Sequence, residues 1–157
     1  MSKEVPQAEM IKLALAIRER AYAPYSKFLV GAALLAEDGQ IFTGCNVENA
    51  SYGMAICAER VAVFNAVANG QRKFTHLALV TEGGVSPCGA CRQVLSEFSP
   101  DMVIFLVDAK KPRKITEGNL WDLLPGRFTL EPPPPPKEPE QIKAKNLKRW
   151  EMGRYDS

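Results

Sequence analysis

The sequence carries almost no excess of either charge, because 20 Lys and Arg residues against 18 Asp and Glu residues give a formal net charge of +2. Proteins that bind nucleic acid or anionic membranes usually show a clustered basic face, so we expect no nucleic-acid partner. No apolar run approaches the ~18 residues that span a bilayer. Residues 1–7 also lack the apolar core of a signal peptide. These absences predict a cytoplasmic protein without a membrane partner.

Apolar residues follow helical and strand patterns in turn. The pattern predicts helices over residues 8–22, 57–70 and 88–98, and strands over residues 28–36, 41–47, 77–80 and 102–107. Asp38-Gly39 between the first two strands is a hairpin signal, so these strands should pair antiparallel. Strands then alternate with helices, which predicts an α/β fold: a three-layer α/β/α sandwich around a mixed, mainly parallel sheet.

The composition changes after Phe128. Residues 132–136 are an unbroken proline run, which favours polyproline II and cannot join the interior of a helix or sheet. Residues 137–157 are rich in charge and poor in aliphatic side chains. A chain of 157 residues suffices for one domain with a real core. We therefore predict one folded domain over residues 1–130 and a flexible tail over residues 131–157.

Cysteine is scarce, and three of the four cysteines stand at predicted helix starts. Cys88 and Cys91 are three apart on a first helical turn, so both sulfurs can face one metal ion. A thiolate from Cys57 would complete three corners of a tetrahedron, and a catalytic zinc keeps the fourth corner for water. Cytosolic thiols stay reduced, which favours metal ligands over disulfides. The sequence thus predicts one zinc ion per chain.

Charged residues lie within these two motifs. Glu59 follows Cys57 by two residues, so its carboxylate can reach the open zinc position and carry protons from bound water. The metal lowers the pKa of that water from 15.7 toward roughly 7. Three thiolates on a zinc dication leave a net negative charge, which a nearby cation should compensate. Arg60 and Arg92 each directly follow a motif residue, so we expect their guanidinium groups to bond the thiolates.

Four segments together resemble the homotetrameric, three-cysteine zinc-dependent cytidine deaminases. They are residues 28–33 (FLVGAA), 44–52 (GCNVENASY), 57–60 (CAER) and 87–93 (PCGACRQ). The resemblance covers roughly residues 8–128. It implies hydrolysis of cytidine and deoxycytidine to uridine and deoxyuridine plus ammonia, as in pyrimidine salvage. It also implies attack by zinc-activated hydroxide, with Glu59 as the proton shuttle.

The resemblance further implies how a pyrimidine nucleoside is bound. Phe28 matches the aromatic that packs against the base. Asn46 and Glu48 match residues that hydrogen-bond the ribose hydroxyls. The backbone N–H of Ala58 would meet the base carbonyl, and the backbone at Ser86 would accept a hydrogen bond from the leaving amine.

Two more roles concern the surroundings of the site. Gln93 would orient Arg60. Tyr52 and Phe128 resemble residues that enter a neighbouring subunit's pocket, which implies a homotetramer with shared active sites. The sequence departs from the family in the proline-led tail that follows Phe128 closely.

The residues alone leave other interpretations open. Cys45 could close a four-cysteine structural zinc site, and His76 could be a ligand, although no second cysteine pair or surrounding motif supports either. Phe28 could be core, and Asn46 and Glu48 could be a solvated strand end. Two other functions stay open as well: a non-enzymatic zinc-stabilised module whose tail docks proline-binding domains, and a deaminase of another amino-heterocycle.

Overall fold

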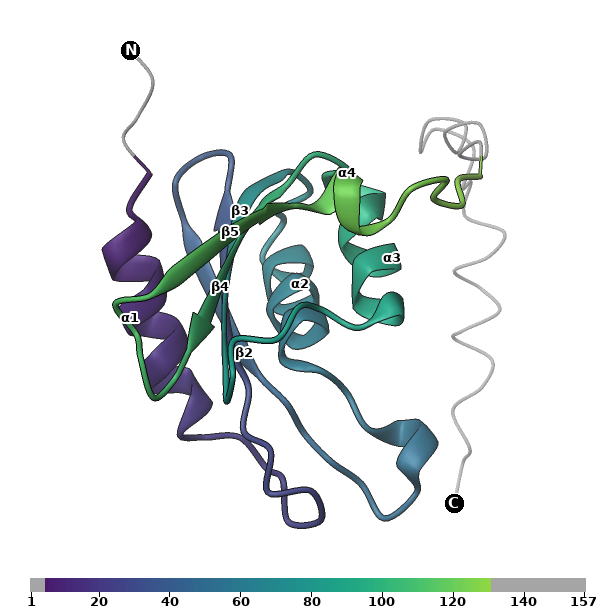
Figure 1. Cartoon of the computed structure of the whole chain (residues 1–157). Helices are drawn as coiled ribbons and strands as arrows, with labels where there is room; N and C mark the ends of the chain where they lie inside the picture. The colour runs from purple at the N-terminus through teal and green to yellow at the C-terminus, as the bar shows by residue number, and fades with distance from the viewer. Residues whose placement is uncertain (1–4, 131–157) are drawn as a thin grey trace, which may run out of the picture.

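The computed structural model describes residues 5–130 and places helices on both faces of one sheet (Figure 1). In chain order the elements are α1 (Gln7–Arg18), β1 (Gly31–Ala36), β2 (Ile41–Cys45), the 3-10 helix η1 (Tyr52–Met54), α2 (Ala58–Ala68), β3 (Phe74–Thr81), α3 (Gly89–Phe98), β4 (Val103–Asp108), β5 (Ile115–Asn119) and α4 (Leu120–Leu123). Within this described part, no helix is long and apolar enough to cross a bilayer. The predicted tail, 131–157, lies outside it.

The sheet is mixed, with the strand order β2-β1-β3-β4-β5. The predicted hairpin is confirmed, because β1 and β2 pair antiparallel with Leu35 opposite Ile41. The expectation of a mainly parallel sheet is wrong: only β3 and β4 pair in parallel, while the β1–β3 and β4–β5 ladders are antiparallel. The reason is that α3 is the only one of the helices in residues 5–130 that connects two adjacent strands. The helix α2 leads from the edge strand β2 to β3, which lies on the far side of β1.

Two apolar clusters hold the three layers together, as the α/β/α prediction requires. One face of the sheet packs on α1, and this cluster includes Met10, Ala14, Ala33, Val80 and Phe105. The other face packs on α2, α3 and α4, and this larger cluster includes Ala62, Val63, Leu79, Leu95, Ile104 and Leu120. Figure 1 shows α1 alone on one side of the sheet and α2 and α3 together on the other. Both zinc-motif helices therefore lie in the same layer.

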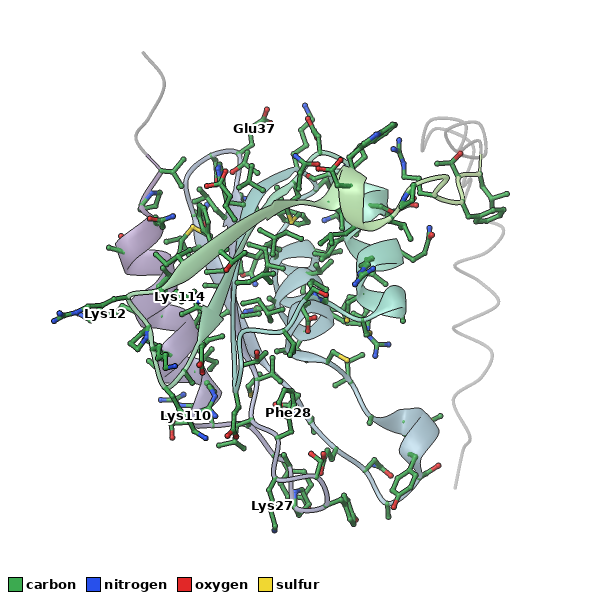
Figure 2. The ribbon with its side chains drawn as sticks, viewed as in Figure 1. Lys12, Lys27, Phe28, Glu37, Lys110 and Lys114 are labelled. Carbon is green, nitrogen blue, oxygen red and sulfur yellow. The ribbon has the colours of Figure 1, made fainter. Side chains whose placement is uncertain are left out.

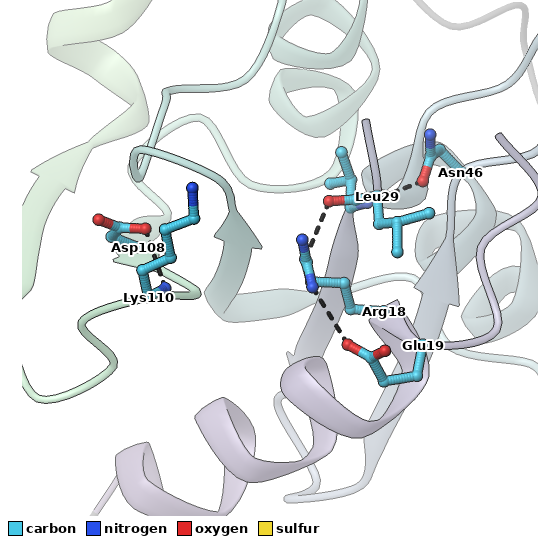
Figure 3. Close-up of polar contacts among 7 residues, drawn as sticks. Arg18, Glu19, Leu29, Asn46, Asp108 and Lys110 are labelled. Atoms are coloured by element: carbon cyan, nitrogen blue, oxygen red, sulfur yellow. Dashed lines mark hydrogen bonds and ion pairs between the residues drawn. The ribbon is translucent and has the colours of Figure 1, made fainter. Parts of the chain in front are cut away.

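The two elements that flank the 19–30 connection are shorter than predicted. The helix α1 ends at Arg18 instead of residue 22, and β1 begins at Gly31 instead of residue 28. The connection is fastened by Arg18, whose Nε donates to the Leu29 carbonyl at 3.0 Å (Figure 3). This bond ties the two ends of the 19–30 connection together.

Gly44 is where β2 touches α2, and a side chain there should be costly. An added Cβ would stand 2.4 Å from the Ala62 nitrogen and 2.5 Å from the Ala58 carbonyl oxygen. Both obstacles are backbone atoms, so strand and helix would have to separate. We expect Gly44→Ala to lower the free energy of unfolding, measured by urea titration, by about 1–3 kcal/mol. Gly118→Ala is the matched control, because nothing lies within 4 Å of its Cβ position. Equal stability of the two variants would contradict the close contact.

Candidate active site

Two helix starts meet at one point and bring three cysteines together. Cys57 is the N-cap of α2, and Cys88 is the N-cap of α3. Both have extended backbone angles, as N-cap residues do. Cys91 lies within the first turn of α3 and is fully buried. The unpaired N–H groups and positive dipole end of each helix favour thiolates over thiols at these positions.

The three sulfurs fit a zinc ion. All three Sγ atoms lie within 4.8 Å of one another. Tetrahedral zinc with Zn–S bonds of ≈2.3 Å requires sulfurs about 3.8 Å apart, which small side-chain movements provide here. Thiolate is also a ligand type that zinc accepts readily. Within residues 5–130, this is the only cluster of metal-ligating side chains.

Arg60 and the neighbouring thiols set the charge at this cluster. The Arg60 Nη2 donates to the Cys57 sulfur at 3.5 Å. A hydrogen bond from the Cys91 thiol, together with Arg60, lowers the pKa of Cys57 to about 5. The same hydrogen bond, together with burial and the charge of Glu59, raises the pKa of Cys91. Cys57 is therefore the first of this pair to become a thiolate.

Glu59 is a buried carboxylic acid beside these sulfurs. Only 4% of its surface is exposed, which is rare for a glutamate. Burial raises its pKa above the usual range, and the negative charge of Cys57 adds to this effect. A hydrogen bond from the Cys91 thiol acts in the opposite direction. A carboxyl in such surroundings is suited to taking up and releasing a proton.

The cluster opens into a cavity of ≈500 Å³, which is a suitable size for a small polar ligand. Its walls come from five parts of the chain: the segment before β1, the segment after β2, η1 with the residues that follow it, the start of α2 and the loop before α3. The lining residues relevant to the predictions are Phe28, Asn46, Glu48, Tyr52, Cys57, Glu59, Arg60, Ser86 and Cys88. A second hollow of ≈350 Å³ shares Ser26, Glu48 and Tyr52 with it.

Phe28 faces this cavity and is not part of either apolar cluster, although an apolar strand alone favoured a core position. It is 37% exposed and lies beyond the end of the sheet (Figure 2). Asn46 holds its backbone: the Asn46 Nδ2 donates to the Phe28 carbonyl at 2.8 Å, and its Oδ1 accepts from the Val30 N–H at 2.8 Å. Figure 3 shows the second of these bonds. Asn46 is thus a fixed side chain with one amide hydrogen left over, unlike a solvated strand end.

Glu48 is also fixed. Its Oε2 accepts from the backbone N–H groups of Tyr25 at 2.8 Å and Ser26 at 3.2 Å, and its Oε1 accepts from the Ser26 hydroxyl. These bonds, the Ser26 hydroxyl first, lower the pKa of Glu48. The Ser26 Oγ in turn accepts from the Phe28 N–H at 3.0 Å. No sequence motif indicates that Ser26 belongs to the site. The one clue in the sequence is that Ser26 lies two residues before Phe28.

Gln93 and Arg92 do not make the contacts that were predicted for them. Ala58 is the first residue of α2, where a backbone N–H has no partner inside the helix. Gln93 donates to the Phe128 carbonyl at 3.0 Å, and the buried Arg60 Nε has no hydrogen-bond partner, so the expected Gln93–Arg60 contact is absent. The prediction that Arg92 bonds a thiolate is wrong, because its three bonded N–H groups reach the loop before α3 and the end of α4.

Four residues with possible roles remain: Tyr52, Phe128, Cys45 and His76. Tyr52 and Phe128 are 80% and 67% exposed, so both are available to another molecule. Cys45 ends β2 and does not belong to the metal-ligating cluster of the described residues, which disfavours a four-cysteine site. His76 stacks on the Phe105 ring, with centroids 5.6 Å apart, and lines a different hollow.

A protonatable carboxyl buried beside a three-sulfur zinc site is typical of enzymes in which the metal activates water and the carboxyl carries its protons. The fold and the site therefore define the class of zinc-dependent hydrolases. Comparison with known sequences gives the family. Residues 5–107 match the family model described as "Cytidine and deoxycytidylate deaminase zinc-binding region". The chain belongs to this zinc-dependent deaminase family.

Individual relatives are similar to this chain over most of its folded part. The cytidine deaminase of Sporosarcina psychrophila is 57% identical over 117 residues, which are 73% of this chain and 85% of that protein. The cytidine deaminase of Halalkalibacterium halodurans is 49% identical over 125 residues, 78% of this chain and 93% of that protein. The crystal structure of cytidine deaminase from Burkholderia pseudomallei superposes with a TM-score of 0.73 at 48% identity, covering 77% of this chain and 98% of that one.

Proposed function

We propose that this chain hydrolyses the exocyclic amine of cytidine and deoxycytidine, releasing uridine or deoxyuridine and ammonia, as a step of pyrimidine salvage. The observation that carries the proposal is the buried Glu59 beside three cysteine sulfurs, at the wall of a cavity of ≈500 Å³. The relatives named cytidine deaminase support the substrate. The near-neutral net charge supports a free nucleoside over a nucleic acid.

Cys57, Cys88 and Cys91 would hold the single zinc ion. When bound there, zinc acts as a Lewis acid that makes water a nucleophile at neutral pH. Glu59 accepts a proton from the attacking water and delivers it to the ring nitrogen beside carbon 4. It then carries the second proton to the amine, which departs as ammonia. One water is consumed and one ammonia is released, so atoms balance and Glu59 ends in its starting state.

Five residues would bind the nucleoside. Phe28 packs on the base, and the Ala58 N–H donates to the base carbonyl. The remaining amide hydrogen of Asn46 and the carboxylate of Glu48 meet the ribose hydroxyls. The backbone at Ser86 accepts from the amine. The hydrogen bonds that fix Asn46 and Glu48 support these roles, because preorganised polar groups lose little freedom when a ligand binds.

Ammonia release from cytidine, deoxycytidine, adenosine and guanine tests the function directly. We expect turnover of the first two and none of the others. Turnover of another amino-heterocycle alone would replace the substrate. Stoichiometric zinc without turnover of any of them would instead favour the non-enzymatic binding module.

Arg60 should tune the zinc site through its bond to the Cys57 sulfur. We expect Arg60→Ala to weaken zinc binding or kcat by ~10- to 100-fold, the usual effect of losing a partner of a metal ligand. Arg60→Lys keeps the charge and should lose less. Arg20→Ala, at an exposed position, is the control. Zinc retention against a chelator and steady-state kinetics provide the measurement, and wild-type values of both for Arg60→Ala would exclude the role.

We further infer a homotetramer with shared active sites. Three exposed apolar side chains, Tyr52, Met54 and Phe128, support an interface, and Tyr52 also lines the cavity. Sedimentation should give four chains per particle. Tyr52→Ala should raise KM at least ~5-fold or yield smaller particles, since buried interface aromatics contribute most of the binding energy. A fully active monomer would contradict shared sites.

The catalytic domain is proposed to comprise residues 1–130, with residues 131–157 dispensable for the chemistry. The proline-rich composition of the second segment supports this boundary. A chain that ends at Leu130 should keep wild-type kcat. We also propose a cytoplasmic location, which cell fractionation tests.

A further inference from the structure

Arg92 makes three hydrogen bonds in three directions from a partly buried position on α3. Its Nε donates to the Pro87 carbonyl at 2.7 Å, and its Nη2 donates to the Ser86 hydroxyl at 3.0 Å. Its Nη1 donates to the Leu123 carbonyl at the end of α4 at 2.9 Å. A guanidinium is planar and rigid, so three such bonds fix their acceptors relative to one another. Arg92 therefore joins the loop before α3 to α4.

The other end of that loop, 82–87, is fixed as well. The Thr81 hydroxyl, 2% exposed, accepts from the Val85 N–H at 2.8 Å. The Asp108 Oδ1 accepts from the Gly83 N–H at 3.1 Å. Gly84 has a φ of +63°, and a Cβ there would stand 3.1 Å from the Asp108 nitrogen. The close backbone approach at Gly84 and the hydrogen bonds of Arg92 together restrict the conformation of this loop.

The loop residues that line the cavity are Val85 and Ser86. The Pro87 carbonyl accepts from Arg92, and Pro87 is not a lining residue of the cavity. Rotation of the peptides on either side of Pro87 would turn the Ser86 carbonyl out of its present direction. With Arg92 absent, the hydrogen bonds at Gly83 and Val85 would remain, and both lie upstream of Ser86.

The geometry points to Arg92 as a positioning residue for the deamination, which acts by holding the Ser86–Pro87 backbone where it accepts a hydrogen bond from the leaving amine. This role rests on the proposed function. Arg92 itself does not line the cavity. A displacement of a reacting or accepting group by about 1 Å can cost ~100-fold in rate, so a residue outside the cavity can still govern turnover.

The test compares Arg92→Lys and Arg92→Ala with the control Arg72→Ala. Arg72 also donates to two backbone carbonyls, of Val67 and Gln71, but lies between α2 and β3, at the opposite end of the sheet. Both Arg92 variants should keep one zinc per chain and lose ~10- to 100-fold in kcat for cytidine. Inhibition by uridine, which has no amine, should stay within about twofold of the wild type. Lysine keeps the positive charge but cannot donate all three hydrogen bonds of Arg92. A loss of kcat in Arg92→Lys therefore separates the effect of geometry from the effect of charge.

Several outcomes would overturn the role. Wild-type kcat in both Arg92 variants would do so. So would a loss of activity that merely follows a loss of zinc or of folded protein, measured by metal analysis and thermal unfolding, because that indicates a structural role only. Equal weakening of cytidine and uridine binding would also contradict amine-specific positioning. If the wild type and Arg72→Ala release no ammonia from cytidine, the proposed function itself fails and this role fails with it.

Discussion

Glu59→Gln is expected to lower kcat for cytidine by ~100- to 10,000-fold, the range that general acid–base help usually supplies. Glutamine has nearly the same shape as glutamate, but it cannot accept and return a proton. The fold and the three sulfurs should therefore persist. Steady-state kinetics, zinc content and the thermal midpoint measured on one preparation provide the result.

Glu97→Gln is the matched control for that variant. Glu97 is an exposed glutamate on α3, the helix that carries two of the three sulfurs, and it does not line the cavity. Its replacement removes the same charge without touching the site, so kcat should stay at the wild-type value. Unchanged turnover in Glu59→Gln would assign the proton transfer to another group. Loss of zinc in Glu59→Gln would instead show that Glu59 stabilises the metal site.

The zinc cluster was predictable because its residues are close in sequence and lie at helix starts. Cys88 and Cys91 share one helical turn, and only Cys57 had to come from elsewhere. The partners of Arg92 and Gln93 were not predictable. Both side chains bond carbonyls more than 30 residues away, at Leu123 and Phe128, and backbone carbonyls leave no trace in a sequence pattern.

The ends of the elements show the same limit. Residues 21 and 22 continue the apolar pattern of α1, yet the Tyr22 N–H donates to the Asn46 carbonyl, and the Tyr22 carbonyl accepts from the Glu48 N–H. Likewise, the Asn46 side chain takes the place of a neighbouring strand beside Phe28 and Val30, so β1 starts at Gly31. In both cases a tertiary hydrogen bond decides where a local pattern stops.

The last strand was missed for a different reason. The strand β5, Ile115–Asn119, lies at the edge of the sheet and has no fully buried residue. Its sequence, ITEGN, shows neither a continuous apolar run nor a strict alternation, which are the two strand signals. Its pairing with β4 therefore depends on the free edge of β4 and on the connection that precedes it, and Ile115 is the one side chain of β5 that packs against an apolar cluster.

Replacing a cysteine of the cluster should have the second large effect. Cys91→Ser removes a buried sulfur ligand and leaves two sulfurs for the metal. We expect a loss of zinc affinity of at least ~100-fold, beyond the ~10- to 100-fold loss typical of outer partners, and no measurable deamination. Because zinc binds the folded chain, its loss should also lower the thermal midpoint.

Cys45→Ser completes this experiment, because it makes the same atomic change at the one cysteine outside the cluster. It should keep one zinc per chain, measured by metal analysis after dialysis, and should deaminate cytidine at the wild-type rate. Zinc loss in Cys45→Ser would instead indicate four sulfur ligands and a closed structural site, which leaves no open position for water. Full zinc and activity in Cys91→Ser would place the metal elsewhere. The pair of variants thus separates a catalytic three-sulfur site from a structural four-sulfur site by a single ratio, the zinc retained by each.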